Sequence, residues 1–305
     1  MIGFIATKPI QIVTCMSIAH QLGGMPVDLH VVRSFADADG VIARLRSRAQ
    51  VFRCVRAAPH RLLALAAQGG DAYRKVFIDS DVGARPTVMM WLLRRLRPQL
   101  SFALYEEGLS LFEPRDDERP WRVFEWLGAT PTLGEGAFTD EVWTYSPEEL
   151  RARLPGKTLS RIDEKPADFI RREHAMLTEV FWPSFATDTS DLQGQRCCFY
   201  LPSWQPDPRS LDYLARRTDH TLLKLHPHTR SREVQARARA AADRVLPAAV
   251  PAELVLSTLA QRFQQVDVLH DGTTTARYFD APNVRFFAID DDEQASRPHR
   301  LAGSS

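Results

Sequence analysis

The sequence predicts an α/β fold in which two domains each hold a parallel sheet covered by helices. Short apolar runs alternate with amphipathic segments along the first half of the chain, as expected when helices bury both faces of a sheet. The same alternation begins again after the polar stretch 188–195. We therefore expect two domains, 1–188 and 189–305, in a chain long enough to bury both cores.

The first domain is expected to alternate buried strands with helices. The strands are the apolar runs Ile2–Ala6, Val27–Val32, Val51–Val55, Lys75–Ile78, Ser101–Tyr105 and Glu141–Tyr145. The helices are expected over 10–22, 37–48, 59–68, 86–97, 120–127 and 166–181. Pro9 and Pro86 fall near the starts of two of these helices, where a missing N–H is harmless. The stretch 154–160 indicates a surface loop that could contain a short strand.

The second domain repeats the pattern on a smaller scale. Strands are expected over 196–201, 221–225, 266–270 and 284–289, with helices over 208–217, 232–244, 252–259 and 273–279. The acidic run 290–293 and the tail after it indicate a frayed end or a returning segment.

Composition excludes several classes of function. The formal net charge is +1, so no global field selects nucleic acid or a membrane surface. No apolar stretch approaches the length of a membrane span, and the first residues lack the pattern of a signal peptide. Cys15, Cys54, Cys197 and Cys198 show no metal-ligand spacing, so we expect buried free thiols in a reducing cytoplasm.

The first candidate site is the tripeptide Glu106-Glu107-Gly108, which directly follows the expected strand 101–105. Ligands of open α/β sheets collect at such carboxyl ends of strands. Two adjacent carboxylates on an extended backbone face opposite ways, so one of them is expected to face a ligand and act as a general base. Gly108 would permit a tight turn or a close backbone approach. An ordinary acidic turn has the same sequence, and the tripeptide alone favours that interpretation.

The second candidate site is Lys224-Leu225-His226-Pro227-His228, where another expected strand ends. Alternation along the strand puts Lys224 and His226 on one side. Pro227 keeps His226 extended and stops the strand. A cation and an imidazole there suit a phosphate-bearing leaving group, to which His226 could donate a hydrogen bond or a proton. A purely structural role is an equal alternative.

The third candidate site is Asp271-Gly272-Thr273-Thr274-Thr275, between an expected strand and an expected helix. Hydroxyls and free N–H groups at a helix start form an anion site. Threonine and aspartate also cap ordinary helices, so the structural interpretation is again strong. The segment is neither a Walker nor a GxGxxG loop, and the other histidines lack partners at metal-ligand spacing.

The order of these motifs resembles that of the bacterial sialyltransferases and polysialyltransferases of the GT-B fold. That family carries an acidic-acidic-Gly motif, a His-Pro motif and a Ser/Thr motif in this order, and Pro251-Ala252-Glu253 here lies between the last two. The opening stretch 6–12 resembles the family's first strand and helix. The resemblance extends from residue 2 to about 290, and it implies two facing Rossmann-like domains with a cleft between them.

The resemblance also implies a role for each matched residue. Glu106 or Glu107 would deprotonate the acceptor hydroxyl, and the Glu-Glu pair leaves open which one acts. His226 would assist departure of the CMP phosphate, which Thr273 and Thr274 would hold. Glu253 would approach the nucleotide at the ribose hydroxyls. Lys224, Pro227, Gly272 and Thr275 complete the expected donor-binding set.

The implied activity is an inverting, metal-independent transfer of sialic acid, or a related nonulosonic sugar. The donor would be a CMP-activated sugar and the acceptor a bacterial surface glycan or glycolipid. Domain 1–188 would bind the acceptor, and domain 189–305 would bind the donor. No cofactor, metal or nucleic acid is expected. Any contact with the cytoplasmic membrane would be peripheral. The sequence does not decide whether the protein forms a homodimer.

Two alternatives compete with this assignment. A GT-B enzyme could use CMP-Kdo or a nucleotide-activated polyol phosphate. A non-catalytic carbohydrate-binding or assembly protein could have kept the same α/β fold.

Overall fold

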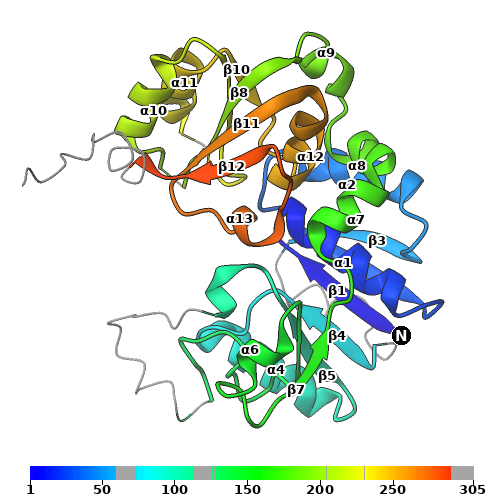
Figure 1. Cartoon of the computed structure of the whole chain (residues 1–305). Coiled ribbons are helices and arrows are strands. Elements are labelled where there is room, and N and C mark those ends of the chain that lie inside the picture. The colour runs from blue at the N-terminus through cyan, green and yellow to red at the C-terminus, as the bar shows by residue number, and fades with distance from the viewer. Residues whose placement is uncertain (60–72, 113–125, 127, 204, 230, 290–305) are drawn as a thin grey trace, which may run out of the picture. The chain divides into compact units, whose positions relative to one another are not determined.

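The chain forms two compact units, Met1–Pro183 and Ser184–Ser305, each built on its own parallel sheet. The computed structural model, drawn in Figure 1, describes residues 1–59, 73–112, 126, 128–203, 205–229 and 231–289. The predicted α/β class with two parallel sheets is confirmed. The roles assigned to the two domains stay predictions.

The first unit holds a seven-stranded sheet in the order β3-β2-β1-β4-β5-β6-β7. Its strands are β1 (Ile2–Ala6), β2 (Val27–Val32), β3 (Cys54–Ala58), β4 (Lys75–Ile78), β5 (Ser101–Tyr105), β6 (Glu141–Thr144) and β7 (Thr158–Arg161). All neighbouring pairs in this sheet are parallel. The strand order changes direction between β1 and β4, and such a switch point opens a crevice at the carboxyl edge of a sheet.

Helices of the first unit connect these strands. They are α1 (Pro9–Gln21), α2 (Ala38–Arg48), α4 (Ala84–Leu96), the short 3₁₀ helix η2 (Leu109–Leu111), α6 (Pro147–Leu150), α7 (Pro166–Arg172) and α8 (His174–Phe181). Pro9 and Pro86 lie in the first turns of α1 and α4, as the sequence predicts.

The structure corrects several of the predicted boundaries in this unit. The strand expected over 51–55 is β3 at 54–58, because pairing with β2 starts only at Cys54. The stretch 154–160 does contain a strand, β7, which pairs with β6. The helix expected over 166–181 is divided into α7 and α8 at Glu173. The helices expected over 59–68 and 120–127 fall almost entirely outside the described residues.

The second unit holds a five-stranded sheet in the order β10-β9-β8-β11-β12. Its strands are β8 (Gly194–Leu201), β9 (His220–Lys224), β10 (Arg244–Leu246), β11 (Phe263–His270) and β12 (Val284–Phe287). Its helices are α9 (Phe185–Thr189), α10 (Pro208–Ala215), α11 (Arg232–Ala241), α12 (Ala252–Arg262) and α13 (Thr275–Tyr278). The strand order changes direction between β8 and β11, so this sheet has a switch point of its own.

Two predictions for the second unit were wrong in detail. The helix expected over 232–244 ends at Ala241, and β10 follows it. Reciprocal hydrogen bonds fix this change: the Thr221 N–H donates to Asp243 Oδ2 and the Asp243 N–H donates to Thr221 Oγ1, each at 2.9 Å. The helix expected over 273–279 is only the four-residue α13. The expected tail at 290–293 lies outside the described residues.

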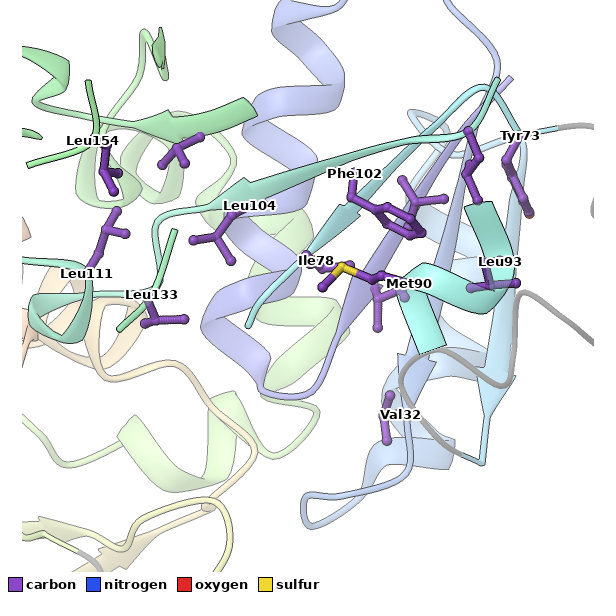
Figure 2. Packing of buried hydrophobic residues seen from close by; sticks show 14 of the residues in the cluster. Val32, Tyr73, Ile78, Met90, Leu93, Phe102, Leu104, Leu111, Leu133 and Leu154 are labelled. Carbon is purple, nitrogen blue, oxygen red and sulfur yellow. The ribbon is translucent and has the colours of Figure 1, made fainter. Parts of the chain in front are cut away.

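Each sheet buries a core of its own. In the first unit, side chains from β4, β5 and α4 form one cluster, in which Met90 and Leu93 of α4 lie beside Ile78 and Phe102 (Figure 2). In the second unit the cluster includes Tyr200, Leu223 and Leu269 from three adjacent strands. The strands of each sheet are thus anchored by a buried apolar core.

A buried carboxylate also fixes the segment that follows the first sheet's carboxyl edge. Asp81, which follows β4, accepts hydrogen bonds from the Gly134 N–H at 3.0 Å, the Gly136 N–H at 3.1 Å and Thr139 Oγ1 at 2.7 Å. A Cβ added at Gly136 would lie only 2.6 Å from Asp81 Oδ2, so this position needs glycine. The segment 134–139 is thus tied to the end of β4.

The cysteines are free, and Cys15, Cys197 and Cys198 are buried as expected, whereas Cys54 is only half-buried. Cys197 and Cys198 are adjacent on β8 and are both buried, because both faces of this sheet are covered. Among the described residues, no helix is both long enough and apolar enough to cross a bilayer.

We expect Leu104→Ala to lower the free energy of unfolding by about 3 kcal/mol, because it leaves a cavity in the first core. Leu104 is 1% exposed, whereas Leu96 at the end of α4 is 67% exposed. The matched control Leu96→Ala should cost less than about 1 kcal/mol. Urea unfolding of both variants measures the difference, and equal losses would contradict the described burial.

Candidate functional site

Polar side chains of the first unit collect at the carboxyl edge of its sheet, on both sides of the switch point. Thr7 follows β1 and Asp79 follows β4, and Thr7 Oγ1 donates to Asp79 Oδ2 at 2.9 Å. Gln11 in the first turn of α1 also donates to this oxygen, at 3.3 Å. All three side chains are buried. These three side chains form a buried polar group at the carboxyl edge of the sheet. The neighbouring strand β5 ends beside them, and the predicted acidic pair follows β5.

Glu106 is a buried structural carboxylate. It is 2% exposed, and its Oε2 accepts hydrogen bonds from Thr144 Oγ1 at 2.5 Å and from the Tyr145 N–H at 2.9 Å. Its own N–H donates to the Trp143 carbonyl at 2.8 Å. These contacts tie the end of β5 to the end of β6, so this carboxylate has its hydrogen bonds within the sheet.

Glu107 lies in a different environment from its neighbour. Its side chain is 13% exposed and forms an ion pair with Lys8, whose side chain is 30% exposed. Lys8 lies at the N-terminus of α1, where its N–H donates to Gln11 Oε1 at 3.1 Å. The accessible carboxylate of the pair is therefore Glu107, and Gly108 after it has a φ of 131°, in the region that favours glycine.

In the second unit, three of the predicted donor-binding residues come together. Lys224 ends β9, Glu253 lies in the first turn of α12, and Thr275 begins α13. Thr275 Oγ1 donates to Glu253 Oε1 at 2.9 Å, and Thr273 Oγ1 lies 3.1 Å from Thr275 Oγ1. Lys224, Glu253 and Thr275 are all buried. Hydrogen bonds join the threonines to Glu253, and Lys224 lies near enough to Glu253 for their charges to interact. We call this group the Lys224 cluster.

Burial shifts the pKa of both ionisable members of this cluster. Desolvation lowers the pKa of Lys224 to about 8, although the nearby charge of Glu253 acts in the opposite direction. Desolvation likewise raises the pKa of Glu253, against the hydrogen bond from Thr275 and the charge of Lys224. In both groups desolvation outweighs the attraction between the two charges.

His226 lies just beyond β9 and is half-buried. Its Nδ1 accepts from the His228 N–H at 3.3 Å, and the two imidazole rings lie 5.3 Å apart. Because Nδ1 accepts, the proton of the neutral ring is on Nε2, which makes Nε2 a donor. Pro227 between them is also half-buried. The strand thus ends just before His226, and the role of His226 as a donor stays a prediction.

The threonine loop differs from the expected helix start. Gly272 has a φ of 82°, and its N–H donates to His270 Nδ1 at 3.1 Å. Thr273 Oγ1 accepts from the Thr275 N–H at 3.3 Å, while Thr274 precedes α13 and makes no side-chain cap hydrogen bond in the described structure. With only four residues, α13 provides no substantial dipole, so an anion here would depend on hydroxyls and loop N–H groups.

A cavity opens at the switch point between β8 and β11, where Asp271 and Gly272 of the third candidate site meet Ser203 and Ser210, which the sequence did not indicate. It has a volume of about 290 Å³, and its lining includes Ser203, Ser210, His270 and Asp271. Asp271 accepts from Tyr200 Oη at 2.5 Å and from Ser210 Oγ at 3.0 Å. Ser203 follows β8 and Asp271 follows β11, on either side of a reversal in strand order, whereas Ser210 lies in α10. That reversal depends on strand pairing, which the sequence does not display.

The predicted residues therefore divide into two groups. Glu106, Glu107 and Gly108 belong to the first unit, and the donor-binding residues belong to the second. Within the residues that the structure describes, no group of three or more His, Cys, Asp or Glu side chains is arranged to hold a metal ion. The union of the two groups into one site stays a prediction.

Comparison with known proteins defines the fold. No family model matches the sequence, and no curated protein matches it significantly. Among solved structures, UDP-GlcNAc 2-epimerase from Neisseria meningitidis bound to UDP-GlcNAc is similar, with a TM-score of 0.54 and 12% identity over 90% of this chain and 78% of that one. The MnaA–UDP complex of S. aureus has a TM-score of 0.50 and 13% identity over 90% of this chain and 74% of that one. The predicted GT-B fold with two Rossmann-like α/β domains is confirmed.

We expect the two glutamates to differ in their effect on stability. Glu106→Ala leaves the Tyr145 N–H and Thr144 Oγ1 without this acceptor and should lower the free energy of unfolding by about 2 kcal/mol. Glu107→Ala removes a partly exposed ion pair and should cost less than about 1 kcal/mol. Chemical denaturation of both variants tests this, and a larger loss for Glu107→Ala would refute the assignment of Glu106 as the structural member.

Burial of Lys224 predicts a characteristic dependence of stability on pH. The folded state loses this proton near pH 8, whereas the unfolded lysine keeps it up to its ordinary pKa of 10.5. The unfolded state therefore binds more protons between these values, so this group makes the free energy of unfolding rise with pH there. Wild type should gain stability relative to Lys224→Met across this window. Parallel pH curves for the two proteins would contradict the buried lysine.

Proposed function

We propose that the protein is an inverting glycosyltransferase that transfers sialic acid, or a related nonulosonic sugar, from a CMP-activated donor to a bacterial surface glycan. The observation that carries the proposal is the Lys224 cluster. Residues of three motifs that match the sialyltransferase order lie together at the carboxyl edge of one sheet, where ligands of α/β folds bind. His226 follows the same strand as Lys224.

The proposed general base is Glu107. A base must reach the hydroxyl of an incoming acceptor, and Glu107 is the accessible carboxylate, whereas Glu106 is buried in hydrogen bonds to β6. Glu107 would take the proton from the acceptor hydroxyl while that oxygen attacks the anomeric carbon. Lys8, paired with Glu107, would orient the carboxylate. Attack opposite the departing CMP would invert the anomeric configuration.

The residues proposed to bind the departing CMP phosphate belong to the second unit. The Nε2–H of His226 would donate to the phosphate as its bond to the sugar breaks. Thr273 and Thr274 would bind the phosphate oxygens through their hydroxyls and through loop N–H groups. Glu253 would hold the threonine loop in place through Thr275, in addition to any contact with the ribose. Activity without a metal follows from the family resemblance.

Two further features favour a nucleotide-sugar donor. The solved structures with the same fold contain UDP and UDP-GlcNAc, as their descriptions state. The cavity at the switch point, about 290 Å³ in volume, adjoins the threonine loop through Gly272 and is large enough for part of a nucleotide. CMP specificity, the nature of the acceptor, a peripheral membrane location and a homodimer remain proposals that rest on the resemblance.

CMP should raise the melting temperature of the wild-type protein, because a ligand that binds only the folded state stabilises it. Replacing Thr273 and Thr274 together by Ala should weaken CMP affinity by about tenfold or more, since hydrogen bonds to a charged group are lost. A screen of CMP-sialic acid, CMP-Kdo, CDP-glycerol and UDP-GlcNAc by thermal shift and calorimetry distinguishes the donors. Stabilisation by UDP-GlcNAc but not by CMP would overturn the donor assignment.

Transfer from CMP-sialic acid should fall by at least about 100-fold in Glu107→Gln and in His226→Ala, because each removes a proton-transfer or donor group. The matched control is His220→Ala, since His220 is an exposed histidine at the opposite end of the same strand β9. This control should keep wild-type activity. Full activity in both Glu107→Gln and His226→Ala would refute the roles proposed for these two residues. No transfer by the wild type, with CMP still bound, would favour the non-catalytic alternative.

A further inference from the structure

The outer face of α4 carries an apolar stripe that is exposed in the described structure. Val88 is 41% exposed, Trp91 48%, Leu92 42% and Leu96 67%. Their spacing of three, one and four residues places them on one side of the helix. Large apolar side chains that are grouped in this way on a surface mark a site of interaction more often than scattered ones do.

The packing of the first unit does not require this stripe. The inner side of α4 is formed by Thr87, Met90 and Leu93, which are all buried. Met90 and Leu93 lie in the core cluster beside Ile78 and Phe102, as Figure 2 shows. A helix that covers a sheet normally carries polar residues on its outer side. In α4 both sides carry apolar side chains. The apolar side chains on the outer side therefore indicate a binding partner that is not part of this unit's core.

The charge on the same face is entirely positive. Arg85 and Arg95 are exposed, and their spacing from Val88 and Leu92 places them on the outer side of α4. The helix contains no aspartate or glutamate. Arg94, by contrast, is on another side and pairs with Asp140. The exposed face thus combines four apolar side chains with two arginines.

We propose that this face of α4 lies on an anionic lipid surface, with Val88, Trp91, Leu92 and Leu96 inserted among the headgroups and Arg85 and Arg95 against lipid phosphates. Tryptophan favours the boundary between headgroups and acyl chains, and arginine reaches phosphates with a long apolar stem. The thirteen residues of α4 span only about 20 Å, so the helix would lie in the plane of the interface rather than cross the bilayer.

Charge complementarity distinguishes this partner from a second copy of the chain. A symmetric contact between two α4 faces would bring arginines of both copies into one apolar interface, and α4 offers no carboxylate to neutralise them. Anionic lipids supply the opposite charge together with an apolar layer. The inference does not depend on the identity of the donor or on catalysis.

The test is sedimentation of the full chain with vesicles of phosphatidylcholine alone and of phosphatidylcholine mixed with phosphatidylglycerol. The protein should bind the mixed vesicles and not the neutral ones, and binding should weaken as salt is raised. Trp91→Ser combined with Leu96→Ser should weaken binding by about tenfold or more, because apolar area is no longer buried. Arg85→Gln combined with Arg95→Gln should weaken it by about tenfold and abolish the preference for anionic lipid.

The matched control is Met25→Ser, which changes an apolar side chain of 46% exposure outside α4 and should leave vesicle binding unchanged. Circular dichroism and melting temperature should be the same for all variants, because the altered side chains lie outside the core. No binding to either vesicle, or equal binding by the α4 variants, would overturn the proposal. So would a dimer, or a complex with an acidic protein, that Trp91→Ser abolishes while vesicle binding is absent.

Discussion

The structure depends above all on the parallel pairing of its strands. In each sheet all strands run the same way, so the segments that follow them emerge along one edge. This constraint puts Glu107 next to Lys8, which follows a strand about a hundred residues earlier in the chain. It also puts Lys224, which ends β9, at the same edge of the second sheet as Asp271, which follows β11. Without parallel pairing, the polar motifs would be isolated turns.

Buried carboxylates hold these edges in shape. Asp81 binds the segment 134–139, Glu106 joins β5 to β6, and Glu253 holds Thr275. A buried charge is costly unless hydrogen bonds or an opposite charge compensate it, and each of these groups has such compensation. The same contacts make the edges rigid, which is the condition for placing reactive groups accurately. Asp81, Glu106 and Glu253 are therefore structural groups, and the proposed general base is the more accessible Glu107.

The sequence predicted elements well where periodicity is local and poorly where pairing sets the boundary. The strands Ile2–Ala6 and Ser101–Tyr105 are continuous apolar runs that any parallel sheet would bury, and they were predicted with their correct bounds. β3 was placed three residues too early because Val51 and Phe52 are apolar without pairing with β2. β10 was missed because its start is fixed by the contact of Asp243 with Thr221 on another strand. No pattern within a short window contains that information.

The sequence by itself determined the α/β class, the two-domain arrangement and the chemical types of the candidate residues, since these follow from hydrophobic periodicity and from residue chemistry. Only the tertiary structure decided that Glu106 is buried and Glu107 accessible, because this depends on the hydrogen bonds that β6 offers. It also decided that Lys224, Glu253 and Thr275 form one cluster and that one apolar side of α4 faces outward. Each of these results depends on contacts between segments distant in sequence, whose free energies local pattern cannot reveal.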